Sequence, residues 1–199
     1  MADNVAVYSN GQLYGSNGAE SNKNCFETTS KETDSSYEGY AVNNETATVE
    51  NQKSVLSKKQ WKPFFKPGDN AISIHIPDDQ PLTTELIINS LEEGRDFFRT
   101  CFPSIDIKAF ICISWLISPT LKSILNPTSN IIGFQDLFVK FPEISQGIEV
   151  FNFVFQKSAD SLSDIDLDLL PENTTLQKNL KKLYKSGKFI YETGGIFKF

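Results

Sequence analysis

The chain contains one histidine, His75, and the position of this residue suggests a chemical role. Imidazole takes up and releases protons near neutral pH, which suits it to act as a general base. His75 falls beside Ser73 on the less apolar face of a predicted strand, close to the strand end where open α/β sheets bind ligands. A hydrogen-bonded structural histidine is the alternative. A site that requires two imidazoles is excluded.

Ser114 and Trp115 interrupt an otherwise apolar segment near its end. One interpretation is a hydroxyl proton donor next to an aromatic pocket wall. The other is a buried hydroxyl bonded to the backbone and an indole in the core. Cys112 shares the face of Ser114, but the sequence offers it no cationic neighbour, so an activated thiolate is not supported.

Composition excludes several classes of protein. The net charge of −6 over 199 residues argues against phosphate-backbone binding, so no nucleic-acid partner is expected. The three cysteines form no CxxC pair, and no metal site is expected. Residues 109–117 form the longest apolar run, which is too short to span a bilayer, and the N-terminus has no apolar leader. We therefore expect a cytoplasmic protein without a membrane partner.

Hydrophobic periodicity predicts an α/β (α+β) fold, a mixed sheet flanked by helices. A helix capped by Thr83 and a helix opened by the capping box at Thr174 are expected. The predicted strands comprise residues 71–76, 109–116, 136–141 and 148–155 and a terminal hairpin of residues 188–191 and 196–199 around Gly194-Gly195. A short helix is expected after Ser118-Pro119, whereas residues 129–135 are ambiguous.

The first 36 residues are polar and carry few large apolar side chains. This composition predicts a partly disordered, mobile segment with a short strand at residues 5–8, or an edge hairpin that turns at Asn10-Gly11. Residues 37–42 and 46–49 are expected to pair as strands across residues 43–45.

A set of short motifs occurs in one order along residues 66–199: Lys66-Pro67-Gly68-Asp69, Ile74-His75-Ile76-Pro77, Phe102-Pro103, Cys112-Ile113-Ser114-Trp115-Leu116, Ser129-Asn130-Ile131 with Phe134-Gln135, and Thr175-Leu176-Gln177 with Gly187. In these motifs the chain resembles the C-terminal, GNAT-like domain of bacterial acyltransferase-domain proteins. The resemblance implies a GNAT-like domain over residues 37–199, after the polar segment 1–36.

The resemblance also implies an acyl-CoA donor and an amine acceptor, with no metal. His75 and Ser114 would be catalytic. Thr83 and Thr84, at a helix start, would hold the donor's pyrophosphate, with Trp115 as a further donor contact. Asn130, Phe134 and Gln135 would contact the substrate. The strands at residues 71–76 and 109–116 would part to admit the pantetheine arm.

One departure from the family pattern supports a second interpretation. The usual glycine-rich pyrophosphate loop is replaced by Pro77-Asp78-Asp79-Gln80-Pro81, whose carboxylates repel phosphate. The alternative is therefore a non-catalytic module that binds a partner, such as a separate N-terminal domain supplied in trans. Trp61, Phe64 and Phe65 would then be its contacts.

Overall fold

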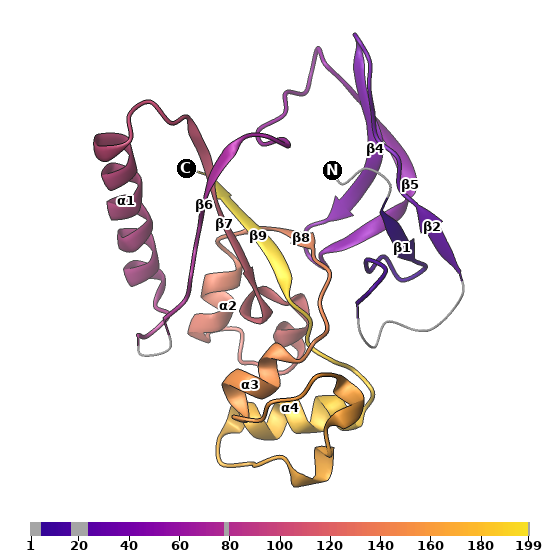
Figure 1. The fold of residues 1–199 in the computed structure, drawn as a ribbon, viewed down its shortest axis with the longest axis vertical. Helices are drawn as coiled ribbons and strands as arrows, with labels where there is room; N and C mark the ends of the chain where they lie inside the picture. Colours follow the sequence, from indigo (N-terminus) through magenta and orange to yellow (C-terminus); the bar gives the residue numbers. More distant parts are fainter. Residues whose placement is uncertain (1–4, 17–23, 78–79, 199) are drawn as a thin grey trace.

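The computed structural model describes residues 5–16, 24–77 and 80–198. The N-terminal strands form small antiparallel sheets, and the remainder of the chain forms a mixed sheet with helices (Figure 1). The predicted fold class, a mixed α/β sheet flanked by helices, is therefore confirmed. Residues 1–4 and 17–23 of the predicted polar segment lie outside the described residues.

The N-terminal sheets contain the strands predicted from residues 5–8, 37–42 and 46–49. β1 (Ala6–Tyr8) pairs with β2 (Cys25–Glu27), while β3 (Lys31–Glu32), β4 (Ser36–Asn43) and β5 (Thr48–Ser57) form an antiparallel sheet. Together they form the region to the right of β8 in Figure 1.

The turn at Asn10-Gly11 is present and joins the two N-terminal sheets. Gly11 has a φ of +85°, and a Cβ on it would lie 2.7 Å from Cβ of Thr48. The Val49 amide donates to the Gly11 carbonyl at 2.8 Å. Glycine is thus required both by the left-handed backbone and by the close approach to β5.

The C-terminal sheet has the strand order β6-β7-β9-β8. β6 (Asn70–Ser73) runs parallel to β7 (Ile107–Ser114), and β9 (Thr193–Lys198) is antiparallel to both β7 and β8 (Val139–Pro142). Paired residues share a face of a sheet, so Ser73, Ile111, Ile196 and Val139 form one row across the four strands. We call this face, which is turned toward the N-terminal sheets, the front face.

Helices cover the back face and one end of this sheet (Figure 1). The α-helices are α1 (Thr84–Cys101), α2 (Asn130–Gln135), α3 (Glu149–Val154) and α4 (Thr175–Lys185), and the 3-10 helices are η1 (Trp115–Ile117), η2 (Pro119–Ser123), η3 (Leu162–Asp164) and η4 (Leu167–Leu169). The Thr83 cap and the Thr174–Gln177 capping box form as predicted. Throughout the described ranges, no helix has both the length and the apolar composition of a membrane span.

Two predicted elements are wrong. Residues 148–155 were expected to form a strand but contain α3, because the buried residues Val150, Phe151 and Phe155 follow helical spacing while Phe153 is exposed. The expected hairpin at the C-terminus is the single strand β9. Its two glycines do not form a turn: a Cβ on Gly194 would overlap the Phe141 ring, so these glycines allow neighbouring side chains to lie on the strand.

The back face of the sheet and the helical end of the molecule have separate cores. Cys112, Phe134 and Phe138 are buried together between the sheet and the α1–α2 side. Trp115, Phe151, Leu180 and Tyr184 belong to the second core, which α3 and α4 share.

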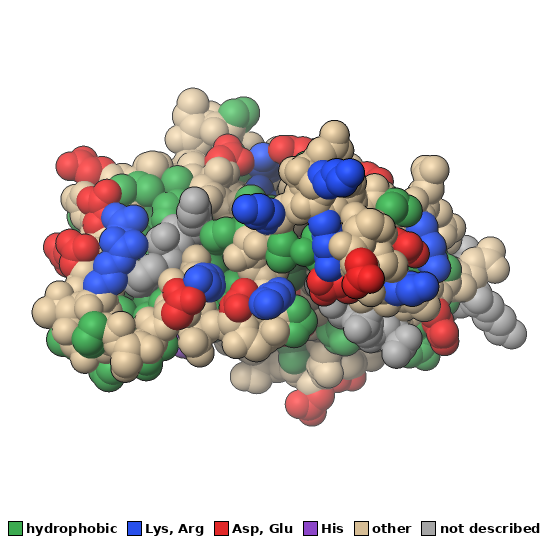
Figure 2. Space-filling view, turned by 90° about the horizontal axis from the view of Figure 1, so that it is seen from above, with side chains coloured by type: hydrophobic (Ala, Val, Ile, Leu, Met, Phe, Trp, Pro, Cys, Tyr) green, Lys and Arg blue, Asp and Glu red, His purple; other side chains and the backbone are tan. Residues whose placement is uncertain are grey.

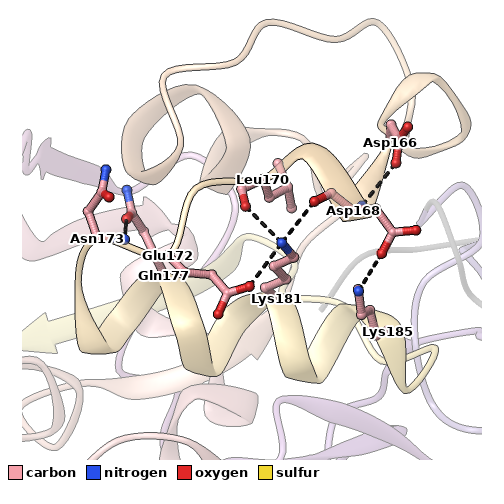
Figure 3. A network of polar contacts seen from close by, with 8 residues as sticks. All are labelled: Asp166, Asp168, Leu170, Glu172, Asn173, Gln177, Lys181 and Lys185. Atoms are coloured by element: carbon pink, nitrogen blue, oxygen red, sulfur yellow. Dashed lines mark hydrogen bonds and ion pairs between the residues drawn. The ribbon is translucent and has the colours of Figure 1, made fainter.

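A buried lysine anchors the segment before α4, residues 164–172, which we call the acidic connector (Figure 3). The Lys181 Nζ donates to the carbonyl oxygens of Asp168 (3.0 Å) and Leu170 (2.9 Å) and forms an ion pair with Glu172 at 3.0 Å. One turn later, Lys185 contacts the Asp168 carboxylate at the surface. The acidic residues of the connector therefore position it on α4.

We expect Lys181→Met to destabilise the fold, because the buried Leu170 carbonyl loses its donor. Such a loss costs about 1–3 kcal/mol in the free energy of unfolding, measured by denaturant titration. Lys185→Met is the matched control and should have little effect, since its ion pair is exposed. Equal losses in both variants would contradict the anchoring role.

Candidate functional site

The parallel strands β6 and β7 separate at one end of their pairing. Their register runs from Asn70 opposite Ile107 to Ser73 opposite Ile111, followed by a bond from the Ile74 amide to the Ile111 carbonyl at 2.8 Å. Beyond this point β7 continues to Ser114 along β9 alone. The pairing of β6 with β7 thus ends at Ile111, and residues 112–114 of β7 pair with β9 alone among the described strands.

His75 lies at this separation and is exposed. Its Nε2 is 3.5 Å from the Ser73 hydroxyl, at the upper limit of a hydrogen bond, so the imidazole lies beside a residue of the front face. An exposed imidazole at this point is accessible to an incoming acceptor and to water.

Ser114 is the last residue of β7. Its Oγ accepts a hydrogen bond from the Leu116 amide at 3.1 Å and thereby caps η1. The hydroxyl proton is not used by this bond, because the oxygen is the acceptor. Ser114 therefore has a structural task, and it shares the face of Cys112, opposite to the side where His75 lies.

Thr83 and Thr84 form the start of α1. The Thr83 Oγ1 accepts from the Leu86 amide at 3.4 Å, and the remaining amides of the first turn have no partner within the helix. A Cβ on Gly133 would lie 3.0 Å from Oγ1 of Thr84, so α2 packs closely on this turn. Asp78 and Asp79 in the preceding loop lie outside the described residues.

The remaining predicted contacts are divided between surface and core. Asn130 is exposed at the start of α2, on the side of α1. Phe134 is buried in the back-face core, and Trp115 in the second core. Gln135 is fully buried, and its Nε2 donates to the carbonyls of Leu116 and Ser118, each at 2.9 Å. Trp115, Phe134 and Gln135 are thus packed inside the domain, away from the exposed His75.

A cavity of about 530 Å³ lies between the N-terminal sheets and the front face, and sequence reasoning missed it. The C-terminal sheet contributes Ile111, Ile196 and Phe141 to its lining, and the N-terminal sheets contribute Val42 and Val49. The alternation in residues 37–42 indicated a half-buried strand. Nothing in the sequence, however, showed that β4 would face β7 and β9.

A small polar pocket of about 50 Å³ adjoins this cavity and shares Leu13, Pro142 and Glu143 with it. Glu192 also lines the pocket. Burial raises the pKa of the Glu192 carboxyl above its ordinary value, and the nearby carboxylates of Glu149 and Glu143 raise it further. The pocket therefore favours a neutral carboxyl or a cationic neighbour.

We expect Glu192→Gln to stabilise the fold at neutral pH, because an ionised, partly buried carboxylate raises the free energy of the folded state. The gain in melting temperature should shrink as the pH falls through the raised pKa toward the ordinary pKa of Glu, since the wild-type carboxyl is then protonated as well. Glu27→Gln, at an exposed site in β2, is the control. A gain in melting temperature that grows as the pH falls would contradict the raised pKa of Glu192.

The thiol in the back-face core is not poised for catalysis. Burial raises the pKa of Cys112 to about 11, and Glu192 adds to the shift. Among the described residues, no group of three or more His, Cys, Asp or Glu side chains is arranged to hold a metal ion. The chemistry available at the parted strands is that of an imidazole, hydroxyls and backbone amides.

The surface carries charges of both signs. On the face in Figure 2, Lys and Arg side chains are interspersed with Asp and Glu, and hydrophobic side chains are visible between them. Among the ion pairs of the described residues, Lys122 pairs with Asp136 at 2.8 Å and with Glu45 at 3.7 Å. Binding to a phosphate backbone would use a continuous basic strip, and none is visible on the face in Figure 2.

Comparison with solved structures finds acyltransferases of the same fold. A structure of an acyltransferase with decanoyl-CoA matches with a TM-score of 0.58 and 22% identity, over 85% of this chain and 46% of that one. Complexes with decanoyl-CoA and teicoplanin, and with CoA and 10C-teicoplanin, match with TM-scores of 0.55 and 20% identity, over 82% of this chain and 46% of theirs. The chain thus spans about half the length of these structures. Comparison with curated proteins finds no match.

The family comparison matches residues 23–197 to the GNAT-like C-terminal domain, and so starts upstream of the domain boundary expected at residue 37. It includes β2 and β3, which pair with β1 and β4. The match covers most of the chain, and the protein belongs to the family of GNAT-like C-terminal domains.

Proposed function

We propose that this chain is an acyltransferase domain that uses an acyl-CoA donor to acylate an amine. The observation that carries the proposal is the separation of β6 and β7 after Ser73, with the exposed imidazole of His75 at the opening. The solved neighbours, which are acyltransferases with CoA or decanoyl-CoA, support the same donor. A cytoplasmic location follows as part of the proposal, because CoA thioesters are intracellular metabolites.

The proposed reaction uses the side chains at the opening. His75 accepts a proton from the acceptor amine as its nitrogen attacks the thioester carbonyl, forming the C–N bond. Backbone amides that no longer pair across the separated strands stabilise the oxyanion. The C–S bond then breaks, and the CoA thiolate takes a proton from the imidazolium of His75. Ser114 lies on the face of Cys112, opposite to His75, so we assign its hydroxyl to the cap of η1.

The donor's phosphates are assigned to the start of α1. The first-turn amides at Thr83 and Thr84 point out of the helix and favour an anion there. α2 packs on this turn through Gly133, one helical turn after Asn130, and the Asn130 amide is proposed to orient the substrate. Trp115, Phe134 and Gln135 are buried, so we assign them to the packing of the domain and not to contacts with the donor or the acceptor.

Thermal unfolding with and without CoA thioesters tests this function. A ligand at 100 times its Kd stabilises the folded state by about 2.7 kcal/mol, which gives a clear rise in melting temperature. We expect this rise with acetyl-CoA and with decanoyl-CoA. The absence of a shift with either ligand, at concentrations up to about 1 mM, would contradict the proposal.

Exposed aromatic side chains favour one second candidate, a module that binds a partner domain. Trp61 is 56% exposed, Phe64 46% and Phe97 55%. Large apolar groups at a surface mark interaction sites. A separate N-terminal domain supplied in trans is the proposed partner, consistent with the longer chains of the solved neighbours. A domain of this kind would show no thermal shift with any acyl-CoA.

A further inference from the structure

The cavity between the sheets begins beside the proposed reaction centre. Its lining includes Ile111, which is the residue of β7 that pairs with Ser73 at the point where β6 ends. The next residue in the same row is Ile196 of β9, which also lines the cavity. Adjacent strands are about 4.8 Å apart, so the row from Ile111 on β7 reaches β8 after about 10 Å.

The lining has the chemistry of a site for an alkyl chain. Aliphatic and aromatic side chains dominate it, and Glu143 is the only charged residue among those the structure places on its wall. The volume of about 530 Å³ is within the range of small-molecule pockets.

Gly194 of β9 helps to keep this space open. The Phe141 ring lies on the face of β9 where a Cβ on Gly194 would otherwise be, so the ring rests against the strand. Phe141 thereby forms part of the wall of the cavity. A larger residue at position 194 would displace the ring from this position.

We propose that the cavity binds the acyl chain of the donor, and that this domain selects medium-length acyl-CoAs over acetyl-CoA. The inference rests on the proposed function and adds the class of donor to it. With the thioester carbonyl at the separation of β6 and β7, the chain runs over Ile111 and Ile196 into the space covered by Val42 and Val49. The occupant is an apolar chain continuous with a bound CoA thioester.

Binding of CoA and of acyl-CoAs with two, six, eight and ten carbons, measured by calorimetry, tests the proposal. Each added methylene should strengthen binding about two- to fourfold until the cavity is filled. Equal affinities for acetyl-CoA and decanoyl-CoA would overturn the acyl-chain site and leave the proposed function intact. The absence of binding by CoA and by every thioester would overturn both.

A substitution that fills the cavity provides the second test. Val42→Trp should abolish the preference for long chains while leaving the affinity for CoA unchanged. Val55→Trp is the matched control, because Val55 is 67% exposed on the neighbouring strand β5 and does not line the cavity. Should Val42→Trp not fold by circular dichroism, Val42→Phe is expected to reduce the preference in the same direction. Preserved chain-length dependence in a folded cavity variant would overturn the proposal.

Discussion

His75→Ala is expected to lower kcat for acyl transfer by about 10²–10⁴-fold, the usual effect of removing a general base. The imidazole is exposed where β6 ends, so its removal leaves no buried space and the melting temperature should hardly change. Release of the CoA thiol from decanoyl-CoA in the presence of an amine acceptor measures the turnover. Donor binding, measured by thermal shift, should persist.

His75→Gln separates a proton-transfer role from a packing role. Glutamine keeps a polar side chain that forms hydrogen bonds but accepts no proton at neutral pH, so it should be as inactive as alanine. Added imidazole should partly restore turnover in His75→Ala, since the space of the side chain is open to solvent. Unchanged kcat in both variants would remove His75 from the mechanism.

The elements with strong local signals were predictable from the sequence. The start of α1 follows from one capping side chain at Thr83, and the start of α4 from the reciprocal bonds of Thr174 and Gln177. The apolar segment 109–116 predicted a strand, and β7 pairs with β9 from Ala109 to Ser114 and also with β6 from Ala109 to Ile111. These signals depend on neighbours within a few residues.

The elements that were missed depend on contacts between distant parts of the chain. The glycines of β9 leave room for the side chains of Phe141, Phe138 and Ile117, and no turn is formed at Gly194-Gly195. Likewise, the cavity forms because β4 faces β7, and these two strands are far apart in the sequence. Local propensity carries no information on either packing arrangement, and so neither the single strand nor the cavity could be derived from the sequence.

The same distinction applies to Trp115, which the sequence presented as either a pocket wall or a core residue. It is 8% exposed and packs in the second core with Leu180, Leu183 and Tyr184. We expect Trp115→Ala to lower the free energy of unfolding by about 3–5 kcal/mol, because a large buried side chain is replaced by a void. That is a large part of the stability of a typical domain.

The other tryptophan of the chain, Trp61, supplies the control for this prediction, since it is 56% exposed and its replacement by alanine should change stability little. Denaturant titration followed by circular dichroism measures both variants without relying on tryptophan fluorescence. Donor binding to folded Trp115→Ala should be near normal at low temperature, because a core residue affects the ligand only through the fraction of folded protein. A variant that keeps its stability but loses acyl-CoA binding would instead assign the indole to the donor site, and the core packing would not be its main role.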